Sequence, residues 1–188
     1  LCSMRMTKRI ETFQALHKTY EGRMRLGAVT ASYDAATPLE DERDTAHITP
    51  EQLRDAAARL TGSIMQLPPM YSAVKVEGQR LYTLARKGME VERNERPVEI
   101  MRFDVLDIAM PEVGFVVECS KGTYVRTLAH DLGQALGCGA YLSELRRTAI
   151  GAFTVDEAWS IDSIGKAAGG APRNTSEMEG ESERLQDA

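Results

Sequence analysis

The chain has 188 residues, of which 43% are hydrophobic and 27% are charged, a balance that suits one folded domain with an ordinary core. It contains no run of about 18 apolar residues and no charged-then-apolar opening segment, so we expect neither a membrane-spanning helix nor a signal peptide. The three cysteines, Cys2, Cys119 and Cys138, are too scattered for a zinc site or a disulfide framework. We therefore expect a reduced, cytoplasmic setting.

The net charge of −5 argues against a nucleic-acid partner, because RNA-binding domains are usually basic. Part of this charge is local, since residues 166–188 carry five acidic and three basic side chains. That stretch is rich in glycine, serine and glutamate and shows no apolar periodicity, so we interpret it as a disordered acidic tail. The remainder is close to balance, and basic clusters in it have to be judged locally.

The N-terminal half predicts two helices with a strand between them. A helix-like stretch runs through residues 13–16, and residues 20–28 alternate apolar with polar or charged side chains, as in a half-buried strand. A polar loop is expected over 33–47. The segment 49–52 reads as a capping box, so a helix begins there, and Gly62 is expected to end it.

The C-terminal half favours strand hairpins mixed with helices. Residues 66–70 contain two prolines and are expected to be irregular. Further elements are expected as strands at 71–76, 98–109, 113–119 and 144–153 and helices at 80–87 and 123–136. This order predicts an α+β fold with a largely antiparallel sheet flanked by helices.

The sequence offers little support for a metal or for a nucleophilic cysteine. The three histidines lack ligand spacing with one another or with the cysteines. We interpret His130 and Asp131 as a solvated pair on a helix rather than as catalytic groups. Cys119 is expected to pack as a small hydrophobe on a strand, and a Cys–His nucleophile pair is an alternative that no spacing supports.

Two basic segments are more informative. Residues 71–82, followed by Arg86 and Lys87, interleave aromatic rings with cations, a pattern suited to stacking bases and holding phosphates of looped RNA. A solvated amphipathic hairpin is the alternative, and spacing alone slightly favours it. Residues 120–126 form a strand-to-helix junction where free backbone donors, reinforced by Lys121 and Arg126, could hold an anion. A plain capped turn is an equally good interpretation of that junction.

These segments together resemble one family, the bacterial tRNA pseudouridine-55 synthases of the TruB type. The resemblance covers about residues 1–161, and its stretches follow in the family's order. They are His17-Lys-Thr-Tyr20 with Arg25-Leu-Gly27, Gln66 to Arg86, Cys119-Ser-Lys-Gly-Thr-Tyr-Val-Arg-Thr127 with Asp131-Leu-Gly133, and Gly137 to Arg147. The resemblance implies the pseudouridine synthase fold and isomerisation of uridine 55 in the T-loop of tRNA. It also implies base flipping, no cofactor and no metal, and a monomer that binds the tRNA T-arm.

The resemblance implies roles for single residues. Tyr20 matches the tyrosine that packs on the flipped base, with its phenol placed for proton transfer. Arg126 matches the arginine that pairs with a catalytic aspartate and keeps that carboxylate ionised. The remaining expected substrate-binding residues are Lys18, Tyr124 and Leu145 around the base, Tyr71, Lys75 and Arg86 in a thumb-like insertion at about 64–97, and Lys121 at the helix start.

One departure from the family is serious, because its Gly-Thr-Leu-Asp-Pro type motif, which carries the nucleophile, does not occur in the chain. Asp34 and Asp131 are the nearest alternatives, and we favour neither. The expectation is that about 40–60 residues precede Leu1 in the complete protein, so that the residues printed here are inactive by themselves. We expect residues 1–165 to form a partial catalytic domain and 166–188 the tail. A tRNA T-arm binding or folding module without catalysis is the alternative function.

Overall fold

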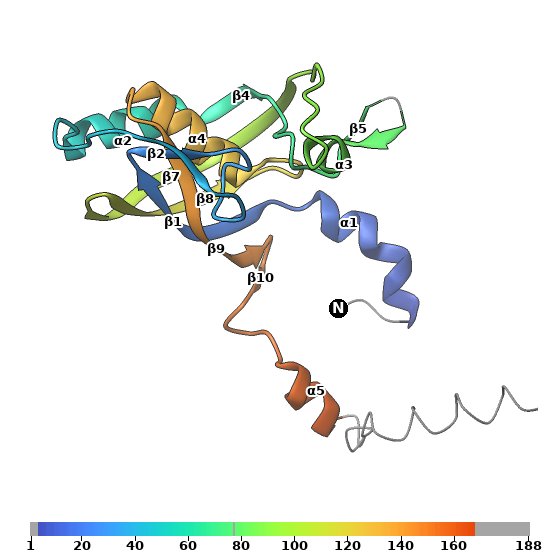
Figure 1. Cartoon of the computed structure of the whole chain (residues 1–188). Helices are drawn as coiled ribbons and strands as arrows, with labels where there is room; N and C mark the ends of the chain where they lie inside the picture. The colour runs from blue at the N-terminus through green and yellow to red at the C-terminus, as the bar shows by residue number, and fades with distance from the viewer. Residues whose placement is uncertain (1–3, 77, 168–188) are drawn as a thin grey trace, which may run out of the picture. The chain divides into compact units, whose positions relative to one another are not determined.

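The computed structural model describes residues 4–76 and 78–167 (Figure 1). The chain divides into two units, Leu1–Val155 and Asp156–Ala188. In the described part of the second unit, helix α5 (Ile161–Ala167) includes Lys166, where the acidic tail was expected to begin. The rest of that predicted tail lies outside the described residues, and the predicted domain boundary at 165/166 stays a prediction. No helix among the described residues is long and apolar enough to cross a membrane.

The first unit is built on a six-stranded sheet in which every neighbouring pair is antiparallel. Its order is β10 (Phe153–Thr154), β9 (Ala140–Ile150), β1 (Lys18–Leu26), β8 (Glu112–Cys119), β7 (Arg96–Ala109) and β4 (Gly62–Gln66). The antiparallel α+β fold predicted from the sequence is confirmed. The hairpin of β7 and β8 falls where it was predicted, whereas β4 was not foreseen.

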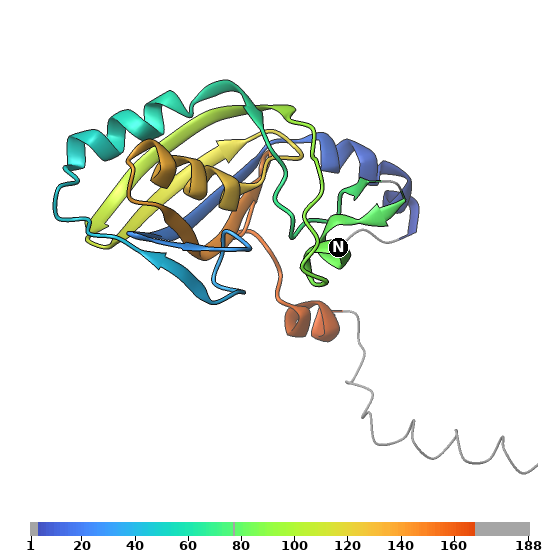
Figure 2. The same ribbon diagram turned by 45° about the horizontal axis from the view of Figure 1, so that its top comes forward.

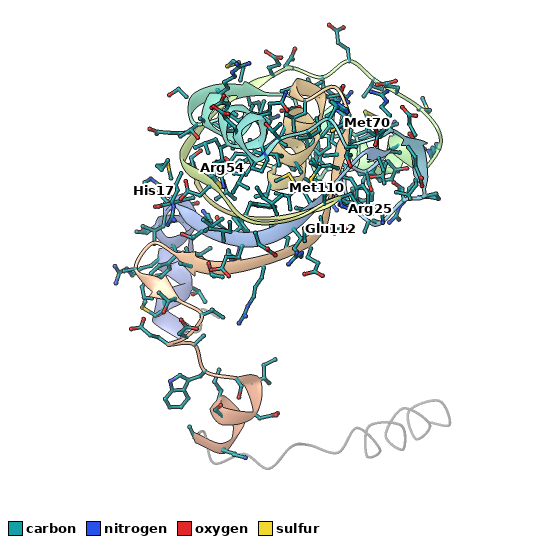
Figure 3. The ribbon with its side chains drawn as sticks, turned by 90° about the vertical axis from the view of Figure 1, so that its left-hand side faces the viewer. His17, Arg25, Arg54, Met70, Met110 and Glu112 are labelled. Carbon is teal, nitrogen blue, oxygen red and sulfur yellow. The ribbon has the colours of Figure 1, made fainter. Side chains whose placement is uncertain are left out.

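Strand β1 occupies the middle of the sheet and alternates as its sequence predicts. Met24 and Leu26 are fully buried on one face, while Glu21 on the other face is exposed. Gly22 leaves the room that the Phe115 ring fills, because a Cβ there would lie 2.8 Å from that ring. Figure 3 shows the far end of the β1–β8 pair, where Arg25 lies opposite Glu112.

After β1 the chain turns at Gly27 into a two-stranded ribbon of β2 (Ala28–Thr30) and β3 (Leu39–Glu42). The sequence predicted only a polar loop over 33–47, and that prediction is wrong for β3. Every residue of β3 is exposed, so the strand carries no apolar alternation that could reveal it. It is a strand because β2 offers it hydrogen-bond partners.

Two helices lie on the same side of the sheet, α2 (Pro50–Arg59) and α4 (Val125–Ala135), as Figure 2 shows. The predicted capping box of α2 is confirmed, since Thr49 and Gln52 exchange side-chain and backbone hydrogen bonds. Helix α4 packs against β9 and buries Leu128 and Leu132 completely. The shared core lies between these helices and the sheet.

Residues 67–95, called the insertion here, leave the sheet after β4 and return to it at β7. The insertion holds two two-residue strands, β5 (Lys75–Val76) and β6 (Gln79–Arg80), and a short helix, α3 (Leu81–Ala85). The strand predicted at 71–76 and the helix predicted at 80–87 are both shorter than expected. Leu81 and Leu84 of α3 are buried.

The chain before β1 is helical, as predicted, with a 3-10 helix at Met4–Arg9 followed by α1 (Ile10–Ala15). Phe13 of α1 contacts the Phe153 ring of β10 edge to face, at 5.6 Å between ring centroids. The strand predicted at 144–153 is instead two strands, β9 and β10, which Gly151 separates with a positive φ.

Candidate active site

The N-terminus of α4 presents a guanidinium that joins three parts of the fold. Arg126 Nη1 donates to Asp34 Oδ2 at 2.7 Å and to the Ser32 carbonyl at 3.4 Å. Its Nη2 donates to the Tyr71 carbonyl, at the start of the insertion. The Tyr124 ring lies 5.9 Å from the guanidinium carbon, within cation–π range. Arg126 therefore ties the helix to the loop after β2 and to the insertion.

The carboxylate of Asp34 is held by the loop that carries it. Its Oδ1 accepts hydrogen bonds from the Ser32 hydroxyl at 2.6 Å and from the Ala36 amide at 3.0 Å. Burial acts to raise the pKa of the carboxyl, but these hydrogen bonds and the neighbouring guanidinium outweigh it and lower the pKa below its ordinary value. With both oxygens engaged, Asp34 is suited to fix Arg126 rather than to attack a substrate.

Two of the residues expected to contact the flipped nucleobase, Tyr20 and Leu145, lie on neighbouring strands of the sheet. Tyr20 is half-buried on β1 and packs against the core, and Leu145 on β9 is 45% exposed. Leu145 pairs in register with Gly22, two residues from Tyr20, so both side chains project from the same face of the sheet. Arg147 pairs with Tyr20 itself and brings a cation to this face.

Lys18 at the start of β1 is already engaged within the chain. Its Nζ donates to the carbonyls of Gln14 and Leu16 at the end of α1. Burial, together with the nearby charge of Arg147, lowers its pKa from the ordinary lysine value. Its expected contact with substrate stays a prediction.

The other expected substrate-binding residues lie farther out. Lys75 on β5 and Arg86 after α3 are exposed on the insertion, and Arg86 stacks over Tyr82 at 5.5 Å from the ring centre. Lys121 is exposed in the turn before α4. The structure brings Tyr71 to Arg126 through its carbonyl, whereas no contact among the described residues joins Lys75, Arg86 and Lys121 to that centre.

The interpretation of His130 and Asp131 as a solvated pair is wrong. His130 stacks on the Tyr33 ring with 3.8 Å between centroids, and its Nδ1 is buried without a hydrogen-bond partner. Burial lowers the pKa of His130. Burial, reinforced by the charge of Glu95, raises the pKa of Asp131 to about 6. Tyr33 adopts a positive φ of 63°, which no sequence pattern signals.

A cleft of about 510 Å³ opens between α4, the β2–β3 ribbon and the insertion. Tyr33, Tyr71, Arg93 and His130 are among the side chains that line it. The charged side chains of this lining balance, because Arg43 and Arg93 lie there with Glu40 and Glu90. The aromatic rings are the part of the cleft that is suited to stacking on an unpaired nucleotide.

Within residues 4–76 and 78–167 no three histidine, cysteine or acidic side chains gather as a metal site would require. Cys119 and Cys138 are buried free thiols, and burial raises the pKa of Cys119. The packing role predicted for Cys119 is confirmed, with 1% of its surface exposed.

Comparison with known proteins shows which family the chain resembles. A model described as "TruB family pseudouridylate synthase (N terminal domain)" matches residues 1–125, and one described as "tRNA pseudouridylate synthase B C-terminal domain" matches 126–178. Relatives named tRNA pseudouridine synthase B include those of Chlorobaculum tepidum, 45% identical over 165 residues, and Burkholderia mallei, 47% identical over 167 residues. These alignments cover 87% and 89% of this chain but 69% and 55% of the relatives.

Solved structures agree at the level of the fold. The "Cbf5-Nop10-Gar1 Complex" matches with a TM-score of 0.59 and 29% identity, over 81% of this chain and 36% of that one. An "H/ACA RNP bound to a substrate RNA containing 2'-deoxyuridine" matches with a TM-score of 0.56 and 22% identity, over 89% and 41%. The fold is that of pseudouridine synthases. The chain belongs to the TruB family, which confirms the resemblance seen in its sequence.

Proposed function

We propose that this protein is a tRNA pseudouridine synthase that isomerises uridine 55 of the T-loop. The observation that carries the proposal is the Arg126 cluster at the start of α4, where a fixed guanidinium lies beside Tyr124. A curated relative named tRNA pseudouridine synthase B is 45% identical over 87% of the chain and supports the same reaction. The partner is the T-arm of tRNA, bound by a monomer.

The reaction is an internal rearrangement of the nucleoside. The bond between ribose C1′ and uracil N1 breaks, the ring turns, and C1′ joins C5. The C5 proton is lost and N1 gains one, so atoms and electrons balance without an oxidant or a reductant. The proposal needs a carboxylate to open the first bond and a group near C5 to move the proton.

The described residues fit these tasks in part. Arg126 keeps a neighbouring carboxylate ionised, and Tyr20 offers a half-buried phenol on the sheet floor. Extruding the uridine from its loop costs a few kcal/mol, which stacking on Tyr20 and Tyr124 would offset. Asp34 is saturated with hydrogen bonds, so we assign the attack to an aspartate that is not among these 188 residues.

The test is formation of pseudouridine on an unmodified tRNA transcript, mapped to the nucleotide. The complete gene product is expected to convert the T-loop uridine, and the 188-residue chain alone is expected to bind the transcript without converting it. Conversion by the short chain would place the nucleophile within it, and Asp34→Asn and Asp131→Asn would identify it. Binding without conversion by the complete product would favour the non-catalytic T-arm module instead.

A further inference from the structure

One buried amide side chain grips the residue that begins α4. Gln66, the last residue of β4, is 2% exposed. Its Oε1 accepts a hydrogen bond from the Tyr124 backbone amide at 2.7 Å, and its Nε2 donates to the Tyr124 carbonyl at 3.1 Å. Both backbone groups of a single residue are therefore paired with one amide. This arrangement fixes Tyr124 as a strand partner would fix it.

These two hydrogen bonds hold Tyr124, a residue that does not cap the helix with its own side chain. Tyr124 is the N-cap of α4, with extended backbone angles, and its side chain makes no capping hydrogen bond. Two residues later, Arg126 carries the guanidinium of the site and donates to the Tyr71 carbonyl. Helix α4 is thus fastened at two points to the segment 66–71, which opens the insertion.

That segment is itself stiff. Two prolines fix its backbone, and Arg93 at the other end of the insertion donates to the Pro68 carbonyl at 3.1 Å. Because Gln66 is buried below this segment, it has almost no surface on which to contact RNA. Its effect on a reaction has to pass through Tyr124 and Arg126.

We infer that Gln66 is a positioning residue for the isomerisation, which sets the Tyr124 ring and the Arg126 guanidinium against the flipped base. The inference rests on the proposed function. Leucine would leave the Tyr124 amide unpaired and would remove one hydrogen bond from the Tyr124 carbonyl, which also accepts from the Thr127 and Leu128 amides. Ionised glutamate would accept from the amide but repel the carbonyl oxygen.

The experiment compares Gln66→Leu, Gln66→Glu and wild type in the complete gene product, with tRNA turnover, tRNA binding and urea unfolding measured for each. For Gln66→Leu we expect kcat to fall about ten- to hundredfold, because small misplacements of reacting groups cost that much. Its Kd for tRNA is expected to stay within about threefold of wild type, since the side chain is buried. The unfolding curves establish that the variants are folded at the assay temperature.

Gln66→Glu separates positioning from general damage to the fold. Protonated glutamic acid has an O–H donor and a carbonyl acceptor, so it can reproduce both hydrogen bonds of the amide. Burial raises the pKa of such a carboxyl. The kcat of Gln66→Glu relative to wild type is therefore expected to rise as the pH falls, whereas the Gln66→Leu ratio is expected to stay flat.

Thr127→Val is the matched control, because Thr127 lies on the same helix, is also 2% exposed, and has a hydroxyl without a hydrogen-bond partner. We expect its kcat within about twofold of wild type. An active wild type with an unchanged Gln66→Leu kcat, or with Kd and kcat lost together, would overturn the inference alone. A wild type without any turnover would overturn the proposed function, and the inference with it.

Discussion

At the scale of single residues, the site depends on how one guanidinium divides its hydrogen bonds. Arg126 donates to a carboxylate and two backbone carbonyls from two separate nitrogens, whereas a lysine ammonium would have to reach all three acceptors from one nitrogen. Only 21% of its side-chain surface is exposed, so an unmet charge at this position is costly.

The first prediction is that Arg126→Lys loses both turnover and stability. Turnover of the complete protein is expected to fall at least about a hundredfold, because under the proposed function Arg126 pairs with the attacking carboxylate and a lysine would misplace it. Unfolding in urea is expected to cost about 2 kcal/mol less, because Asp34 and the two carbonyls lose a partner. Arg23→Lys is the matched control, since Arg23 pairs with Asp107 at the exposed outer face of the sheet. An Arg126→Lys protein as active as this control would contradict the assignment.

The second prediction concerns Asp131, whose folded pKa of about 6 lies above its ordinary value of 3.8. A raised carboxyl pKa means that the ionised form costs stability above pH 6 and that this cost disappears as the pH falls below 4. Asp131→Asn is therefore expected to stabilise the protein at pH 8 by about 1 kcal/mol, allowing for a partly exposed side chain. Urea unfolding at pH 8 and pH 4 measures the gain, which should vanish at the lower pH.

Glu95→Gln is the companion to this variant, because the Glu95 charge is the second cause of the raised pKa of Asp131. It should give a smaller gain at pH 8 than Asp131→Asn, and the two gains should not add in the double variant. A loss of stability in Asp131→Asn at pH 8 would show that the carboxylate has a favourable partner in the folded protein.

At the scale of elements, the sequence predicts those whose signals are local. The capping box at Thr49 marks the start of α2, and alternation marks β1. The sequence did not predict β3 and β4, because pairing with a neighbouring strand, rather than their own residue pattern, makes them strands. The insertion is similar, since β5 and β6 have two residues each and exist only as partners.

The candidate site residues also divide into those that a local motif identifies and those that only a long-range contact reveals. The resemblance identified Arg126 and Tyr20, because their flanking motifs are long and specific. Asp34 was seen only as a poor nucleophile, because it meets Arg126 from 92 positions away and no spacing announces such a contact. Gln66 lies inside a recognised motif, yet its hydrogen bonds to Tyr124 across 58 positions became visible only in the structure.

The third prediction tests how closely α4 packs on β9. A Cβ at Gly133 would lie 2.1 Å from the Ala140 amide nitrogen and 2.3 Å from the Gly139 carbonyl carbon, which are backbone atoms that cannot move aside. Gly133→Ala is therefore expected to destabilise the protein by about 3 kcal/mol through overpacking. In an open helix the same change would gain about 1 kcal/mol, so even the sign distinguishes the two cases.

Urea unfolding measures the effect, and Gln134→Ala is the control on the same helix, because its side chain is exposed. We expect that control to lie within about 0.5 kcal/mol of wild type. A Gly133→Ala protein as stable as the control would mean that α4 can move away from β9 at little cost.

At the scale of the whole molecule, the net charge of −5 and an RNA partner are compatible only if the cations are concentrated where RNA binds. Residues 75–87 of the insertion fit this condition, because Lys75, Arg80, Arg86 and Lys87 there stand against Glu77 alone, and Arg80 and Arg86 lie over the Tyr82 ring. Figure 1 shows the insertion at one end of the sheet unit and α2 at the other. No contact among the described residues joins Lys75 or Arg86 to Arg126, so substitutions of these two cations should affect RNA binding separately from the chemistry at α4.

The last prediction follows from this separation. Each phosphate contact that is removed should reduce the slope of log Kd against log salt by about 0.7 to 0.9, so Lys75→Ala with Arg86→Ala should reduce it by about 1.5. Filter binding of tRNA over a range of salt concentrations measures the slope, while kcat at saturating tRNA should change less than about threefold. Arg54→Ala on α2 is the control, since it removes one positive charge, as each of the two insertion changes does, at an exposed position away from the insertion (Figure 1). If Arg54→Ala reduced the slope as much as one of the insertion changes, overall charge rather than a local patch would govern the encounter, and the insertion would lose its role as the RNA grip.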